Sequence, residues 1–135
     1  MTARRGLLAA AVVLIAALLA WWVWPGDDGK AAQHMAAGPY LVDLRVPGGS
    51  PRTGDNTVEL DITDQGGSPV APEKVSVEPA MPQMGHALPP SVATTDAPGH
   101  YRATVNLPMP GQWEIAVNLS GSAGTGRATF AVRVN

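Results

Sequence analysis

The chain has 135 residues, of which 15% are charged and 45% hydrophobic, and its formal net charge is −2. This length suits one domain with an appendage, and without a basic patch or a charge run the sequence gives nucleic-acid binding no support. The chain contains no cysteine, which excludes disulfides, so the fold must rest on an apolar core.

The N-terminal region predicts a single membrane anchor. Residues 6–24, GLLAAAVVLIAALLAWWVW, carry no charge, and an apolar helix of about 18 residues reaches roughly 27 Å, close to the thickness of a hydrocarbon core. Two arginines precede this run and two aspartates follow it. The positive-inside rule therefore places residues 1–5 in the cytoplasm and the C-terminal domain on the extracytoplasmic side of the cell membrane. The context of Ala20 is a poor cleavage site, which favours an uncleaved signal-anchor over a cleaved signal peptide.

The rest of the chain divides into a linker and a β domain. Residues 25–38 are small, polar and without a period, which predicts a linker. In residues 39–135, apolar and polar residues alternate in short segments separated by glycine and proline. This pattern predicts an all-β fold, an immunoglobulin-like antiparallel β-sandwich of about seven strands. The segments are 40–46, 57–63, 73–78, 90–96, 100–107, 112–119 and 127–135. The last two are expected to form a hairpin that places Trp113 and Phe130 at the centre of the core.

The residues do not indicate an enzyme. The three histidines are scattered along the chain, and the strand carboxylates fall on faces predicted to be solvated. No serine lies in the setting of an activated nucleophile, and no glycine-rich loop could hold a phosphate. His100 begins a strand on the outer face, where we expect an exposed surface residue. A noncatalytic function is therefore expected.

A methionine-rich loop is the strongest candidate site. The stretch EPAMPQMGHALPP, residues 78–90, places Met81, Met84 and His86 within six residues. Thioethers are soft, neutral ligands that select Cu(I), and imidazole also suits copper. Zinc prefers thiolate, imidazole or carboxylate, and calcium and magnesium prefer oxygen. If proline and glycine bend the loop, the three side chains can converge on one Cu(I) ion.

A structural role for the same loop stays open. Methionine also fills gaps in cores, so the loop could close one end of the sandwich as a lid, with His86 hydrogen-bonded to a backbone carbonyl. Met109, in LPMPGQW, would be a fourth metal ligand or a packing partner if its turn lies beside the loop. His34 and Met35 are adjacent in the expected linker, where we expect no ligand role.

Three motifs in one order resemble the YtkA-like domain and its FixH-like relatives. They are D-x-x-G-x-P-V with an extra glycine at 64–70, P-x-MP-x-MGH at 79–86, and G-x-Y-x-x-x-V-x-L-x-MPG-x-W at 99–113. The resemblance spans residues 40–134 and implies a small, membrane-anchored, extracytoplasmic β-sandwich. It marks the loop at 79–86, with a framework of Tyr101, Pro110, Gly111 and Trp113.

The implied function is that of a noncatalytic accessory domain. Binding of Cu(I) by Met81, Met84, His86 and Met109 would serve copper handling or respiratory oxidase assembly. The alternative is a metal-free protein-interaction module that docks on a membrane complex. The partners expected are the membrane itself and either a membrane protein complex or a copper protein.

Overall fold

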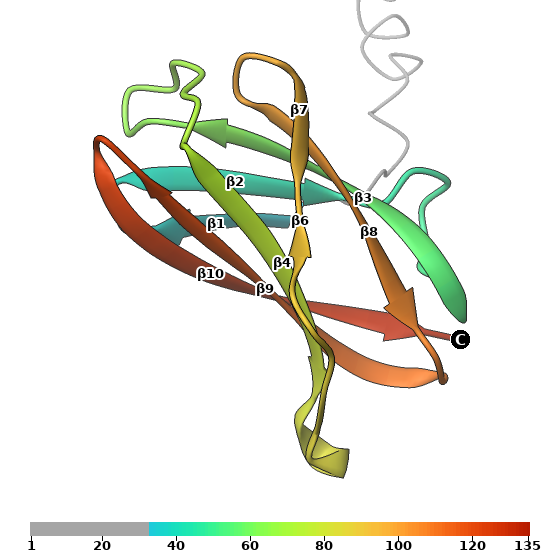
Figure 1. Ribbon diagram of the computed structural model, residues 1–135. Coiled ribbons are helices and arrows are strands. Elements are labelled where there is room, and N and C mark those ends of the chain that lie inside the picture. The colour runs from blue at the N-terminus through green and yellow to red at the C-terminus, as the bar shows by residue number, and fades with distance from the viewer. Residues whose placement is uncertain (1–32) are drawn as a thin grey trace, which may run out of the picture.

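The computed structural model describes residues 33–135, which form ten strands and one turn of 3₁₀-helix (Figure 1). The all-β prediction is confirmed. The elements are β1 (Gln33–Ala37), β2 (Tyr40–Arg45), β3 (Gly54–Thr63), β4 (Lys74–Met81), η1 (Pro82–Met84), β5 (His86–Ala87), β6 (Ser91–Val92), β7 (Thr94–Ala97), β8 (His100–Leu107), β9 (Gly111–Gly121) and β10 (Gly124–Val134).

Two antiparallel sheets pack face to face. One has the strand order β1-β2-β3-β8-β7, and the other has the order β10-β9-β4-β5, with β6 pairing with β4. β8 returns beside β3 in the first sheet while β9 pairs with β4 in the second, so the chain crosses between the layers along its length. This arrangement is a β-sandwich, whose two inner faces supply the core.

The expected anchor at residues 6–24 lies outside the described residues, as do the expected cytoplasmic end and residues 25–32 of the linker. In the part of the chain that the structure describes, no helix is long and apolar enough to cross a bilayer.

The sandwich begins earlier than the sequence suggested. Gln33–Ala37 falls in the expected linker, yet it forms β1 and pairs along its whole length with β2. The side-chain amide of Gln33 donates to the carbonyl of Ala131 on β10 at 2.7 Å, and Ala37 is fully buried. β1 therefore bridges the two sheets at one edge, so a soluble fragment must include it.

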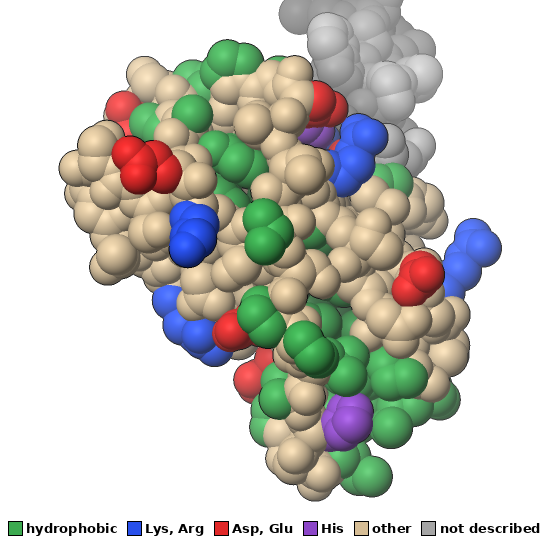
Figure 2. Space-filling model, viewed as in Figure 1, with side chains coloured by type: hydrophobic (Ala, Val, Ile, Leu, Met, Phe, Trp, Pro, Cys, Tyr) green, Lys and Arg blue, Asp and Glu red, His purple; other side chains and the backbone are tan. Residues whose placement is uncertain are grey.

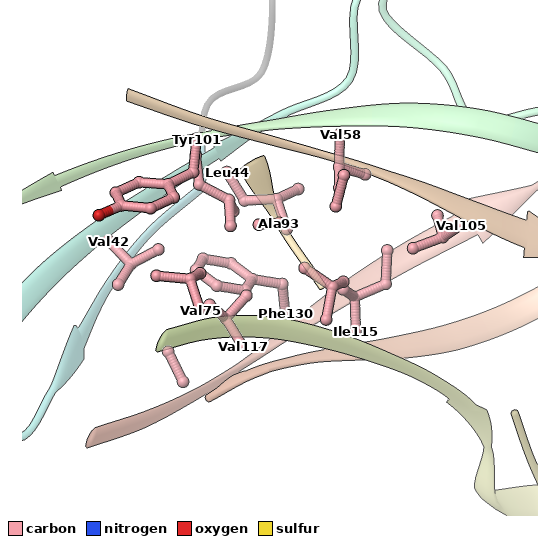
Figure 3. Close-up of a cluster of buried hydrophobic side chains, with 14 of the residues drawn as sticks. Val42, Leu44, Val58, Val75, Ala93, Tyr101, Val105, Ile115, Val117 and Phe130 are labelled. Atoms are coloured by element: carbon pink, nitrogen blue, oxygen red, sulfur yellow. The ribbon is translucent and has the colours of Figure 1, made fainter. Parts of the chain in front are cut away.

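The alternating residues meet in one core, as the sequence predicted (Figure 3). Trp113 and Phe130 from the neighbouring strands β9 and β10 are its largest fully buried side chains. At about 25 cal/mol per Å² of apolar surface, burial of this kind is the main stabilising term for a chain without disulfides. The residues labelled in Figure 3 come from both sheets and point into the space between them: Val42, Leu44, Val58, Val75, Ala93, Tyr101, Val105, Ile115, Val117 and Phe130.

Two buried tyrosines tie loops to this core. The hydroxyl of Tyr101 donates to the carbonyl of Pro72 at 2.8 Å, and that of Tyr40 donates to the carbonyl of Gly124 at 3.0 Å. Burial, with a smaller contribution from Tyr40, raises the pKa of the Tyr101 phenol above its ordinary value. The neutral phenol is thus the form that the folded state prefers.

This pKa shift predicts a loss of stability in alkaline solution. Below the unfolded pKa of about 10 the phenol is protonated in both states. Above that pH the unfolded phenol ionises first, which favours unfolding. The contribution of Tyr101 to the free energy of unfolding is therefore lost as the pH rises through the folded pKa. Denaturant unfolding between pH 8 and 11, followed by circular dichroism, should show a shallower alkaline decline for Tyr101→Phe than for the native domain. Equal slopes would contradict this prediction.

Candidate metal site

A projecting hairpin carries the methionine loop. β4 ends at Met81, η1 turns the chain, and β5 brings it back at His86, below the body of the sandwich in Figure 1. Pro82 suits the first position of η1, because its fixed φ is helical and its missing N–H has no partner to lose. Gly85 adopts a left-handed φ of 61° and donates its N–H to the carbonyl of Pro82 at 3.0 Å. These two residues close the hairpin, as the bend in the predicted site requires.

The return of the chain pairs Met81 with His86. The two residues are direct cross-strand partners on β4 and β5, so their side chains stand on the same face, with Cβ atoms roughly 5 Å apart. That face continues the inward row of Val75 and Val77 along β4. The thioether and the imidazole are thus neighbours at the end of the core.

Trp113 lies at the centre of this end of the core. Its ring meets the His86 ring edge-on, with centroids 6.4 Å apart and planes at 75°, and its indole N–H donates to the carbonyl of Met109 at 3.0 Å. A Cβ atom built on Gly111, which faces inward two residues before Trp113, would lie 3.1 Å from the methyl carbon of Met81. The PMPG turn therefore lies beside the loop, which is the condition under which Met109 is considered as a fourth ligand or a packing partner.

The four predicted ligands differ in how far their side chains are exposed to solvent. Met81 is only 4% exposed and Met109 is half-buried against the core, whereas Met84 is 67% exposed. His86 is exposed, with one side of its ring against Trp113. We call Met81, His86 and Met109 the inner group, because His86 pairs with Met81 and its ring contacts Trp113, whose indole binds the backbone carbonyl of Met109. Met84 lies on η1, which has no buried residue.

The ring of His86 is available for coordination. Within residues 33–135, it makes an aromatic contact and no hydrogen bond; the imidazole hydrogen bonds of this region belong to His34 and His100. The hydrogen bond from His86 to a backbone carbonyl, which the lid hypothesis expected, is therefore not formed with any of these residues. The ring is exposed, and no group among residues 33–135 hydrogen-bonds to either of its nitrogens.

The loop and the turn that carry the inner group contain no charged residue. Residues 79–95 and 103–113 contain no aspartate, glutamate, lysine or arginine. Figure 2 shows hydrophobic side chains, one histidine and tan atoms, which are backbone or uncharged polar side chains, over the lowest part of the molecule, with the charged side chains higher up. Such a site suits a soft monovalent ion with neutral ligands better than a hard divalent cation, which needs anionic oxygens.

The other two histidines lie elsewhere and are held by carboxylates. His34 on β1 pairs with Asp43 on β2. His100 is not the exposed surface residue that we expected: its side chain is 23% exposed, and Nδ1 lies 2.8 Å from Asp61, which also accepts from Arg45 at 2.5 Å. The prediction failed because Asp61 on β3 and Asp96 on β7, the two strands beside β8, both reach the imidazole ring. Among residues 33–135, no three or more His, Cys, Asp or Glu side chains gather in a way that could hold a metal ion.

Together, the fold and this end of the core define a small β-sandwich domain with a sulfur- and imidazole-lined hairpin. The YtkA-like family model matches residues 34–118, from β1 through most of β9. The chain belongs to the YtkA-like family. The matched segment contains both the hairpin and Trp113, whereas the FixH-like kinship stays a prediction.

Two further comparisons concern known proteins. No curated protein matches the chain. Among solved structures, the chain is similar to an engineered protein solved by the Northeast Structural Genomics Consortium, at 15% sequence identity and a TM-score of 0.53. The alignment covers 79% of this chain and 21% of the engineered protein. This likeness concerns the fold alone.

Proposed function

We propose that the protein is a membrane-anchored, extracytoplasmic accessory domain, noncatalytic and of the immunoglobulin-like type, that binds Cu(I) at the end of its sandwich. The domain would function in copper handling or in respiratory oxidase assembly. The observation that carries this proposal is the pairing of Met81 with His86 on one face of the hairpin, beside Trp113 and Met109.

The chemistry of the inner group supports Cu(I) as the ion. Two thioethers and one imidazole supply soft and borderline donors, and none of them brings a negative charge. The rigid β4 strand sets the position of Met81, and the short loop sets that of His86. Ligands held in place by the fold lose little conformational entropy on binding, which strengthens a site with few donors.

The membrane part of the proposal rests on residues 6–24. Their length, lack of charge and flanking arginines support a position of the domain outside the cytoplasm. An extracytoplasmic position suits a copper-handling domain in a bacterial cell. The expected partner is a membrane complex or another copper protein.

A competition titration tests the copper site. The full chain in detergent micelles is titrated anaerobically with Cu(I) against a chromophoric Cu(I) chelator. We expect the native chain to hold about one Cu(I), and Met81→Leu/His86→Ala/Met109→Leu to bind at least about 100-fold more weakly, since loss of an outer-shell partner alone costs 10–100-fold. Leucine keeps the volume of methionine but removes the sulfur. The control is Met35→Leu, an exposed methionine on β1 far along the chain from the site.

The titration, together with a melting curve of the variant, distinguishes the copper site from the alternative function as a metal-free interaction module. If neither the native chain nor the variant competes for Cu(I), and the variant melts several degrees lower, the inner group is packing. The exposed side chains of Met84 and Val92, at 67% and 73%, would then favour a metal-free module that docks on a membrane complex.

A further inference from the structure

We propose that Met84 is an exchange ligand, through which Cu(I) passes between the inner group and an acceptor protein with sulfur ligands. This inference rests on the proposed function, and it assigns to Met84 a role different from that of the three other predicted ligands. The inner group would set the affinity for Cu(I), while Met84 would set the rate of its transfer.

The contrast in burial leads to this assignment. The sulfur-bearing side chain of Met81 is 4% exposed and that of Met84 is 67% exposed, although only two residues lie between them along the chain. Met84 lies two residues before His86, on a helical turn with no buried residue and no packing partner in the core. Met84 thus holds its thioether in solvent at the tip of the hairpin, where a partner protein can reach it.

An exposed thioether beside a buried one suits ligand exchange. An acceptor cannot reach the sulfur of Met81, because the sandwich covers it. Methionine has three rotatable bonds, so the side chain of Met84 can turn from solvent toward the ring of His86 without moving the backbone. Cu(I) would first gain the Met84 sulfur, then lose one inner ligand, and then gain an acceptor sulfur. Copper stays in the +1 state throughout and no electron is transferred; a cysteine acceptor releases its thiol proton to solvent as its sulfur binds copper.

The surface around Met84 indicates the kind of acceptor. The hairpin is uncharged from residue 79 to residue 95, and it projects beyond the sandwich (Figures 1 and 2). An uncharged projection fits an uncharged recess on a partner without the desolvation of unpaired charges. We infer an acceptor that presents thioether or thiolate sulfur in such a recess.

The test measures affinity and transfer rate in one protein. The full chain carries Trp21→Phe/Trp22→Phe/Trp24→Phe, which leaves Trp113 as the single remaining tryptophan of the original four. Cu(I) bound to the inner group is expected to quench Trp113 fluorescence. Mixing the loaded protein with a synthetic Cys-x-x-Cys peptide in a stopped-flow instrument then reports the transfer of Cu(I) as recovery of fluorescence.

For Met84→Leu we expect the affinity to change less than about threefold and the transfer rate to fall by on the order of tenfold, a kinetic effect without an equilibrium one. Met81→Leu should instead weaken the affinity, and Met35→Leu should change neither. Transfer at the native rate in Met84→Leu would overturn the inference, as would a loss of affinity equal to that of Met81→Leu. If Cu(I) leaves the fluorescence and the chelator titration of the native chain unchanged, the proposed function itself fails.

Discussion

Replacing Trp113 by alanine is expected to lower the free energy of unfolding by about 3–5 kcal/mol, the usual cost of removing a large buried aromatic side chain. Trp113 is 0% exposed and lies at the end of the core where the two sheets meet the hairpin. This loss of stability has two sources: the apolar surface that is no longer buried, and the cavity that the smaller side chain leaves. The carbonyl of Met109 would also lose the indole N–H that binds it, and His86 would lose the ring against which it packs.

Urea unfolding of a fragment spanning residues 25–135, followed by circular dichroism, measures this effect. The fragment contains β1 and every residue of the hydrophobic core, which runs from Ala37 to Val134. Trp113→Phe should fall between alanine and the native residue, because it keeps a ring but loses the hydrogen bond. Glu114→Ala, on the exposed face of the same strand, should stay within about 0.5 kcal/mol of native. A loss below about 1 kcal/mol for Trp113→Ala would mean that this end of the core is loosely packed.

Replacing Gly126 by alanine is expected to cost about 3 kcal/mol, at the upper end for overpacking. A Cβ atom on Gly126 would lie 2.0 Å from the carbonyl oxygen of Ala37 and 2.5 Å from its carbonyl carbon. Both are backbone atoms of β1, which its pairing with β2 holds in place. One strand must therefore move, and the contact between β1 and β10 that closes this edge is lost.

Thermal melting of the same fragment is the measurement. Gly66→Ala is the matched control, because its Cβ would face only the Asp64 side chain, at 3.3 Å, in an exposed turn. We expect the control to melt within a few degrees of native and Gly126→Ala to melt more than about 10 °C lower, given a shift of 4–8 °C per kcal/mol in a domain of this size. Equal melting temperatures would show that β1 does not rest on β10 in solution.

The alternation of apolar residues was sufficient to predict the sandwich. In a strand, neighbouring side chains point to opposite faces, so rows such as Val58, Leu60 and Ile62 identify the buried face directly. Strand β1 was not predicted, because apolar and polar residues do not alternate in its sequence, QHMAA. Its strand form depends on distant residues: the backbone of β2, the carbonyl of Ala131 and the missing side chain of Gly126.

The sequence by itself limited the distance between Met81 and His86 to about 18 Å, because an extended chain spans at most about 3.6 Å per residue. Only the tertiary structure decided which side chains of this loop face the core. Met81 is buried at the end of the core, its partner His86 has its ring against Trp113, and Met84 is left in solvent. The reason is that a hairpin's register depends on where the chain reverses, and one residue of shift moves every side chain to the other face. The place of Met109 likewise depended on β9 packing beside β4, a contact between segments far apart in the sequence.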